Sequence, residues 1–550
     1  MSHPLIAIGL DAADPQLLED WMEAGHLPTL KQLRNQGTYG RLLNHESYRA
    51  ETPWTNFLTG TLPTKTGYWG PVKYDPANYQ ATEQGAYKFQ EYPPFYALGD
   101  DYKVAIFDMP QTQLSEQANG PQVLAWGAHS PQGGSQSLPK DLLNQVQQKY
   151  GNHPGLNRDY ADCRDLNALG RLQKWMEIGI ERRANVCHDW LTQSNWDLLL
   201  TIFGETHTAG HYHWHMSQDH PIYKAGKVDA PDTLLAIFQA IDSAISKILT
   251  QAPDQSNVLI FSAHGMGANV MDIPSMIFLP ELLFRWNYPG QYGLAYSPAN
   301  RPLGAPKLRF KKRGWIGEVW DLKYEKNPLR AWLRQFLPTD FHNRLEKLFG
   351  PSRSAKLESP YGQKRQGDSL FWQPANWYRP YWPEMKAFAL PSYSEGYVRI
   401  NLKGRETHGV VEPEEYDAVC DQLSALISGM TDARTGKSMV ERIIRTRTTE
   451  TLNTPKLPDA DLIVLWQEDT ASDTADSPEV SRIGPVPFLR TGSHRAEGFL
   501  LGCGPDFQPG GSFPSDIKAV DLAPTILQLM EAPIPDYFDG RPILNRIALT

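Results

Sequence analysis

Three short apolar runs, each followed closely by residues that bind metals or anions, set the strongest limit on the fold. The runs cover residues 5–10, 196–203 and 258–262, and they precede Asp11, a histidine cluster that starts at His207, and His264. Runs of this length are typical of strands buried on both faces of a parallel sheet. The amphipathic segments 166–192 and 234–249 predict helices between them. Because open α/β sheets bind ligands at the carboxyl ends of their strands, we expect these residues to meet at one edge.

The densest group of potential metal ligands lies in the sequence GETHTAGHYHWH, residues 204–215. It contains Glu205, His207, His211, His213 and His215. His207 and His211 are four residues apart, so on a helix they lie on one face, within reach of a single ion. A polar helix start whose histidines face water explains the same spacing. Ligands from elsewhere in the chain would decide between the two interpretations.

Composition indicates a globular protein. A chain of 550 residues with 41% hydrophobic residues buries a large core, and its length suggests several domain-sized units. The net charge of −9 argues against nucleic acid as the main partner. The four cysteines are scattered and form no CxxC pair, which argues against a disulfide framework. Neither a long apolar run nor a signal-like start occurs, so we expect a cytoplasmic location.

The segment 50–60, AETPWTNFLTG, contains candidate catalytic residues. Pro53 suits the first turn of a helix, which would make Thr52 or Glu51 the capping position. The free amides and the dipole at a helix start stabilise negative charge, so a hydroxyl there would be well placed to attack a phosphoryl group. A plain helix cap explains Thr52 equally well.

The order of these motifs resembles the type I phosphodiesterase and nucleotide pyrophosphatase family of the alkaline phosphatase superfamily. The matching segments are Gly9–Asp11, Leu27–Leu30, Phe57–Gly60, Ala263–Met266 and Thr491–Gly498. The resemblance implies an α/β fold with an alkaline phosphatase-like, mixed, mostly parallel central sheet, helices on both faces, and a variable cap insertion. We expect the N-terminal part of the core in 1–284, the cap in 285–385, a small α+β element in 386–480, and the rest of the core in 481–550.

The resemblance also implies a metal site, with departures from the family pattern. His211 and His494 match family histidines, whereas His207 stands where the family has an aspartate; together the three would hold one divalent metal, with zinc favoured over manganese or iron. Asp11 and His264 match part of a second metal site.

Two other members of that second site are replaced. The family's nucleophilic threonine falls on Ala50, and an aspartate falls on Ala263. A second ion would therefore be weak, absent, or held with the help of Glu51, Thr52 or Glu205, so we expect one or two ions. With a single ion, water would replace the threonine as the nucleophile.

These features predict a metal-dependent hydrolase of small anionic phosphate esters, similar to a phosphodiesterase or nucleotide pyrophosphatase. One alternative is a catalytically degenerate member that binds an anionic ligand or partner. Another is a phosphonate or sulfate ester hydrolase on the same fold. The C/S-x-P-x-R motif of sulfatases does not occur near residue 50, which argues against the sulfate variant.

The cap region has an unusual charge. Residues 301–350 contain twelve lysines or arginines against five acids. Trp332 and Leu333 lie beside Arg330 and Arg334, which suits an amphipathic helix on an anionic membrane or a lid over an anionic substrate. A solvated insertion is the alternative. We therefore expect that 301–350 either contacts a membrane peripherally, selects substrate, or only covers the core.

Overall fold

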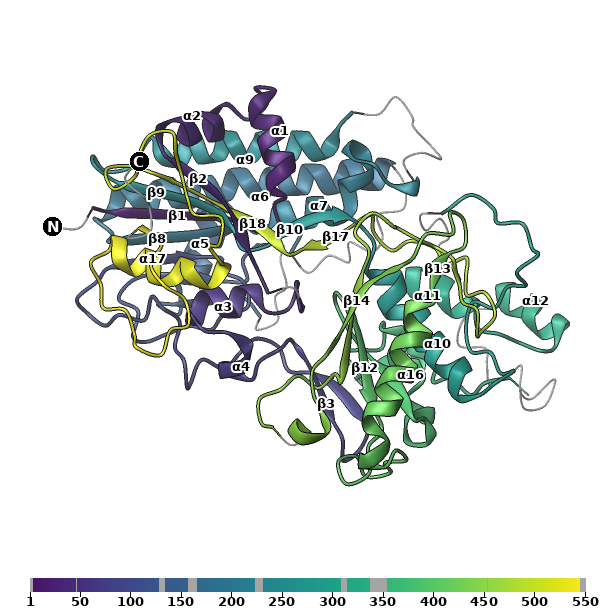
Figure 1. Cartoon of the computed structure of the whole chain (residues 1–550). Coiled ribbons are helices and arrows are strands. Elements are labelled where there is room, and N and C mark those ends of the chain that lie inside the picture. Colours follow the sequence, from purple (N-terminus) through teal and green to yellow (C-terminus); the bar gives the residue numbers. More distant parts are fainter. Residues whose placement is uncertain are drawn as a thin grey trace.

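The computed structural model describes residues 3–45, 47–127, 134–156, 166–222, 231–307, 314–336, 354–452 and 454–544. Figure 1 shows two lobes, one built on a large sheet and the other on a smaller antiparallel sheet. The chain builds most of the first lobe, crosses to the second, and returns with its C-terminal part to complete the large sheet.

Nine strands of the described chain form the large sheet. Their order is β19 (Gly511–Ser512), β2 (Thr38–Leu43), β18 (Glu497–Cys503), β9 (Asn257–Ser262), β1 (Leu5–Leu10), β8 (Leu198–Phe203), β5 (Val104–Phe107), β6 (Gln122–Leu124) and β7 (Gln136–Leu138). The strands from β9 to β6 are parallel, and β18 runs antiparallel to both β9 and β2. The predicted mixed, mostly parallel sheet is confirmed.

Helices cover both faces of this sheet (Figure 1). One face carries α1 (Pro15–Glu23), α2 (Pro28–Gln36), α5 (Leu142–Tyr150), α6 (Leu166–Gln193) and α9 (Thr233–Leu249), and the other carries α3 (Pro53–Thr59) and α17 (Leu522–Leu529). Alternate residues of β1 face the two sides: Ile6 and Ile8 pack in one core and Leu5 and Ala7 in the other. This two-sided burial explains why the strand sequence is apolar throughout.

The second lobe has a core of its own around a four-stranded sheet of described residues. The sheet order is β11 (Ala387–Leu390), β12 (Gly396–Ile400), β15 (Leu462–Trp466) and β14 (Val440–Arg445), and all the pairs are antiparallel. Around it lie a π-helix (Pro274–Phe278), α10 (Leu279–Asn287), α11 (Gly314–Asp321), α14 (Pro360–Arg365), α15 (Pro374–Trp377) and α16 (Tyr416–Ser428). The division of the chain at residues 284, 385 and 480 stays a prediction.

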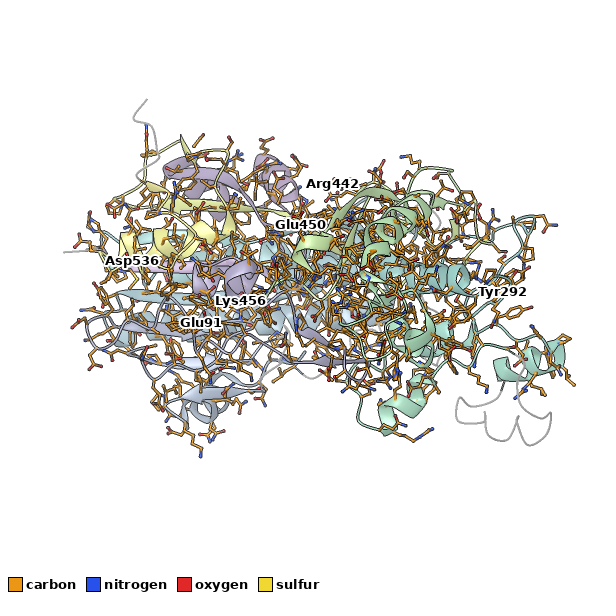
Figure 2. All side chains as sticks on the ribbon, turned by 60° about the horizontal axis from the view of Figure 1, so that its bottom comes forward. Glu91, Tyr292, Arg442, Glu450, Lys456 and Asp536 are labelled. Carbon is orange, nitrogen blue, oxygen red and sulfur yellow. The ribbon has the colours of Figure 1, made fainter. Side chains whose placement is uncertain are left out.

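An early segment of the chain ties the two lobes together. After α3 and α4 (Pro63–Thr66), the hairpin of β3 (Val72–Asp75) and β4 (Gln80–Glu83) enters the core of the second lobe. Lys456 of the second lobe donates to the Lys65 carbonyl at 2.6 Å and pairs with Glu91 at 3.1 Å (Figure 2). This segment therefore runs from the core of the first lobe, at α3, into the core of the second, at the β3–β4 hairpin.

The basic cap region is described only in part, because residues 308–313 and 337–353 lie outside the described chain. Helix α12 (Pro328–Phe336) leaves Leu329 and Trp332 about half exposed, at 53% and 56%. The Arg330 side chain is buried and lies 3.8 Å from Glu325. Membrane contact through this region stays a prediction. Among the described residues, none of the helices has the length and apolar character needed to cross a membrane.

Candidate metal centre

Helix α7 (Glu205–Ser217) follows β8 after a single residue and carries the histidine cluster. Asp11 follows β1, which pairs with β8 in parallel so that Leu10 lies opposite Phe203. The Thr206 hydroxyl donates to the carbonyls of Asp11, at 2.6 Å, and Phe203, at 2.8 Å. The start of α7 is thereby fixed to the carboxyl ends of both strands, which is the edge where the sequence predicts a site.

A short antiparallel pair, β10 (Gly265–Ala268) and β17 (Gly492–Arg495), brings His494 to the same place. Gly492 allows β17 to approach α7, because a Cβ atom there would lie 2.0 Å from the Gly210 carbonyl oxygen. The Thr491 amide donates to the His211 carbonyl at 2.8 Å. In Figure 1, α7, β10 and β17 lie on the side of the first lobe that faces the second.

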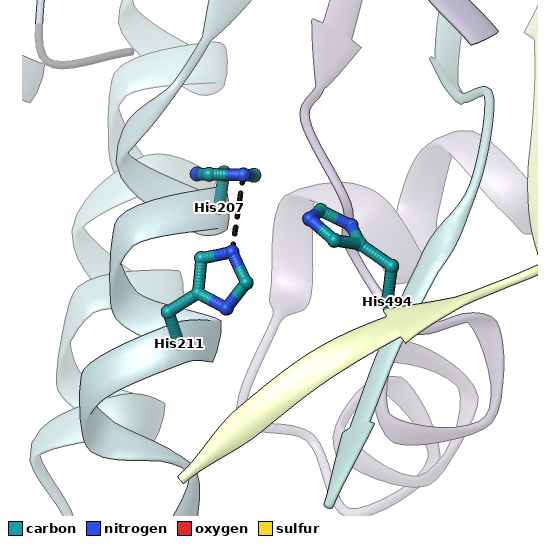
Figure 3. Close-up of side chains that lie close together, drawn as sticks. All are labelled: His207, His211 and His494. Carbon is teal, nitrogen blue, oxygen red and sulfur yellow. Dashed lines mark hydrogen bonds between the residues drawn. The ribbon is translucent and has the colours of Figure 1, made fainter. Parts of the chain in front are cut away.

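His207, His211 and His494 come together at this junction (Figure 3). One ring nitrogen from each lies within 4.8 Å of the others. The Nε2 atoms of His207 and His211 are 3.2 Å apart, close to the roughly 3.3 Å expected for two nitrogens bound tetrahedrally to one zinc at about 2.0–2.1 Å. Nδ1 of His211 lies 2.8 Å from the Gly492 carbonyl, which orients the ring as in many metal sites. The residues therefore fit a divalent ion.

The nature of the ligands narrows the choice of metal. Imidazole nitrogen suits zinc or iron better than manganese, which prefers carboxylate and carbonyl oxygen. His211 and His494 are buried, whereas His207 is partly exposed and marks the open side of the group.

Asp11 and His264 lie next to the three histidines. The ring centroids of His264 and His494 are 4.8 Å apart, and His264 Nε2 lies 3.8 Å from Asp11 Oδ1. The Trp54 indole donates to the same Asp11 oxygen at 3.1 Å. All five residues proposed as metal ligands from the sequence thus form one continuous group. Trp54 is an additional member that sequence reasoning missed, since a tryptophan in a first helical turn usually indicates only packing.

The Thr52 hydroxyl does not point toward the start of α3, contrary to the sequence-based expectation. Thr52 does precede that helix, but its side chain makes no capping hydrogen bond. The amides of Glu51 and Thr52 both donate to the Tyr48 carbonyl, at 3.1 and 3.2 Å, and the Thr52 hydroxyl donates to the same carbonyl at 3.1 Å. This tight turn engages the hydroxyl with a backbone carbonyl, so the expected capping of the helix start by the Thr52 side chain is wrong. A catalytic role for Thr52 stays a prediction.

The Glu51 carboxylate faces the second lobe. It accepts hydrogen bonds from the hydroxyls of Ser394, at 2.7 Å, and Tyr397, at 3.1 Å, and from the Tyr393 amide at 3.2 Å. Burial, and then the nearby Glu395 carboxylate, raise the pKa of Glu51 to about 7. Glu51 is therefore engaged by the second lobe and not by the histidines.

Glu205 anchors α7 and is turned toward other partners. Its carboxylate lies 3.1 Å from His153 and 3.3 Å from Arg183, which also pairs with Asp108 at 2.7 Å. Burial alone would raise the pKa of Glu205, but Arg183 and then His153 lower it to about 2. The suggestion that Glu205 rebuilds a second metal site finds no contact in its favour among the described residues.

His213 and His215 are buried packing residues. Their Nδ1 atoms lie 2.7 Å from the Thr233 hydroxyl and 2.8 Å from the Thr491 hydroxyl. Burial lowers the pKa of His213 to about 3 and that of His215 to about 4, so both rings are neutral at pH 7. Neither ring binds the candidate metal centre and neither faces water, as the alternative interpretation expected; both pack in the interior.

Residues 5–358 match the family described as type I phosphodiesterase / nucleotide pyrophosphatase, which is more than half of the chain. The chain belongs to this family. The resemblance drawn from the motifs is thereby confirmed, and the family's name places the chain among hydrolases of phosphoric esters.

Two crystal structures of phosphonoacetate hydrolase from Sinorhizobium meliloti 1021, in complex with phosphonoformate and with phosphonoacetate, are similar to the chain. Each alignment has 11% identity and covers 96% of both chains, with TM-scores of 0.44 and 0.42. These values are too low to transfer a ligand. No curated protein matches the chain.

Proposed function

We propose that the protein is a metal-dependent hydrolase of small phosphate esters, with one divalent ion, zinc first, held by His207, His211 and His494. The observation that carries this proposal is the convergence of these three imidazoles from α7 and β17. Three histidines leave one position open in a tetrahedral site, as catalytic zinc sites require. When bound there, the ion would lower the pKa of water and offset the charge of a phosphoryl oxygen.

The residues beside the histidines have complementary roles in this proposal. Asp11 is held by the Trp54 indole and lies 3.8 Å from His264 Nε2. Asp11 and His264, which match part of the family's second metal site, would supply two ligands to a second ion beside the first. His207, at the open side, borders the space where a phosphate ester would enter.

The proposed nucleophile is water and not a side chain. Ala50, which matches the family nucleophile, has no hydroxyl, and the Thr52 hydroxyl is bonded to the Tyr48 carbonyl. Glu51, the other candidate, is bonded to Ser394 and Tyr397. This arrangement supports attack by water over a covalent intermediate on the chain.

The same departures favour a second candidate, a catalytically degenerate member that binds a small anion at a metal without hydrolysing it. Ala50 and Ala263 stand where the family has a nucleophile and a metal ligand. A site that keeps three ligands of one metal but lacks these two groups could still bind the metal and an anion after losing the ability to hydrolyse it.

One experiment separates the candidates. Metal content of the purified protein is measured by mass spectrometry, and hydrolysis of bis-p-nitrophenyl phosphate is followed for wild type, His494→Ala and the exposed control His26→Ala. The hydrolase proposal expects about one ion per chain, with ion and activity both lost only in His494→Ala. A bound ion together with no hydrolysis of bis-p-nitrophenyl phosphate supports the degenerate candidate. No ion in the wild type refutes both.

A further inference from the structure

Helix α12 lies at the end of the second lobe that is away from the first lobe (Figure 1), and it turns apolar side chains outward. Leu329 and Trp332 are 53% and 56% exposed, more than any other large apolar side chain of the described residues. The Arg330 side chain, in contrast, is only 6% exposed and lies 3.8 Å from Glu325. An ordinary surface helix buries its apolar face and exposes its charges, so α12 has the reverse polarity.

Aromatic rings lie near α12. Figure 2 shows Tyr292 at the same end of the second lobe as this helix. The ring centroid of Tyr292 is 4.2 Å from that of Tyr296 and 5.1 Å from that of Tyr324, which precedes the first residue of α12 by four positions. Tyr296 is 36% exposed. We call Tyr292, Tyr296, Leu329 and Trp332 the tip surface.

The exposed charges in the segment that carries the tip surface are all positive. From residue 289 to residue 333, the exposed charged residues of the described chain are Arg301, Lys307 and Lys326. The described acidic residues of the same segment are partly buried; they are Glu318, Asp321 and Glu325. The segment therefore presents apolar groups and positive charge to the solvent, and its acids are withdrawn.

An anionic lipid surface fits this combination better than a second copy of the chain. Two copies that met through the tip surface would bring like charges together, which weakens association. Anionic lipid headgroups instead attract lysine and arginine. Tryptophan and tyrosine rings are also favoured at the boundary between headgroups and acyl chains, because each combines an apolar body with a polar atom.

We propose that the tip surface docks the protein on an anionic lipid bilayer, with Leu329 and Trp332 inserted among the headgroups and with Arg301 and Lys326 facing the lipid phosphates. For residues 301–350 we expected membrane contact, substrate selection or a plain covering role, and the outward apolar side chains of α12 favour the first. A helix of nine residues lies on a bilayer and does not cross it. Docking requires neither a bound metal nor hydrolysis, so it goes beyond the proposed function.

Flotation of the full-length protein with lipid vesicles tests this proposal. One set of vesicles contains phosphatidylcholine alone, and the other contains phosphatidylcholine mixed with phosphatidylserine. We expect the protein to float with the mixed vesicles and to bind phosphatidylcholine alone at least about tenfold more weakly, because the basic residues then lose their anionic partners. Salt at high concentration should weaken binding to the mixed vesicles, since it screens exposed charges.

Substitutions locate the surface that binds. The double change Leu329→Ser and Trp332→Ser should weaken binding to the mixed vesicles at least about tenfold, because the inserted apolar area is lost. Leu166→Ser is the matched control, since Leu166 is 47% exposed on α6 of the first lobe, and it should leave binding unchanged. Lys326→Glu should weaken binding about fivefold or more. Lys31→Glu, an exposed change on α2, should not.

Three flotation results would overturn the proposal. They are no flotation with the mixed vesicles beyond the level without lipid, equal binding to both kinds of vesicle, and wild-type binding in the double variant. Circular dichroism checks the fold of each variant, and Lys326→Glu decides the question if the double variant does not fold.

Analytical ultracentrifugation without lipid tests the other occupant. A dimer that is lost in the double variant would show that the tip surface binds a second copy of the chain, and the proposal would be wrong. We expect the same sedimentation for wild type and for the double variant. None of these measurements depends on metal binding or activity, so their failure is distinct from a failure of the proposed hydrolase.

Discussion

Replacing Gly492 with alanine should separate α7 from β17 and weaken metal binding. The added Cβ would lie 2.0 Å from the Gly210 carbonyl oxygen and 3.3 Å from His211 Cα. An ordinary carbon–oxygen contact is about 3.3 Å, so the two elements must move apart by roughly 1.3 Å. The contacts between them, His211 Nδ1 to the Gly492 carbonyl and the Thr491 amide to the His211 carbonyl, are both 2.8 Å and would exceed hydrogen-bond length.

The expected magnitude follows from these two contacts. Loss of a residue that orients a metal-binding histidine typically lowers affinity about 10- to 100-fold. Overpacking of this kind also costs about 1–3 kcal/mol of stability. We therefore expect Gly492→Ala to bind zinc at least about tenfold more weakly and to unfold at a lower temperature.

Zinc affinity is measured by competition with a fluorescent chelator, and the fold is checked by circular dichroism. Gly170→Ala is the matched control, because no atom lies within 4 Å of its added Cβ. Alanine there should leave zinc affinity unchanged and stabilise α6 by up to about 1 kcal/mol. A folded Gly492→Ala protein with wild-type zinc affinity would refute the role assigned to this close approach.

Three further changes test the other assignments. Thr52→Val should keep hydrolysis near wild type, because the hydroxyl is bonded to a backbone carbonyl, and should cost about 1 kcal/mol of stability in thermal unfolding; complete loss of activity would restore Thr52 as the nucleophile. Trp54→Phe should lower kcat/KM about tenfold, because Asp11 loses a donor; unchanged kcat/KM would contradict this. Burial lowers the pKa of His213 to about 3, so the folded ring stays neutral while the unfolded ring gains a proton below about 6.5. Its contribution to the free energy of unfolding should therefore fall by up to about 1.4 kcal/mol per pH unit as the pH drops from roughly 6 to 4. Urea unfolding at pH 7, 6 and 5 measures this pH dependence, which should be present in wild type and absent from the contribution of residue 213 in His213→Asn.

The large sheet and the residues at its edge were predictable because the sequence patterns that indicate them lie within short segments of the chain. The run before Asp11 is apolar throughout, and β1 is buried on both faces as such a run indicates. The spacing of His207 and His211 placed them on one helix face without knowledge of the rest of the chain. In contrast, His494 lies 283 residues beyond His211, so only the family resemblance connected them.

Side-chain direction near the family nucleophile was not predictable from the local sequence. Glu51 bonds to Ser394 and Tyr397, which belong to the other lobe and lie more than 340 residues away. The capping hypothesis considered only α3 and its dipole, whereas the tight turn at Tyr48 decided the direction of the Thr52 hydroxyl. Propensity within one segment cannot include such partners, and tertiary contacts override it.

The departures from the family pattern at residues 207 and 263 both make the proposed site less negative. By the motif resemblance, His207 falls where the family has an aspartate and Ala263 where it has another, so the proposed site has two negative charges fewer than that pattern implies. Asp11 is the carboxylate that remains of that matched set, and it is 0% exposed beside His264. A divalent ion held by three neutral imidazoles keeps more of its positive charge than one held by carboxylates. In the proposed enzyme this excess would favour strongly anionic phosphate groups, and with a single ion it would partly offset the charge that a second ion would otherwise supply to the reacting phosphoryl group.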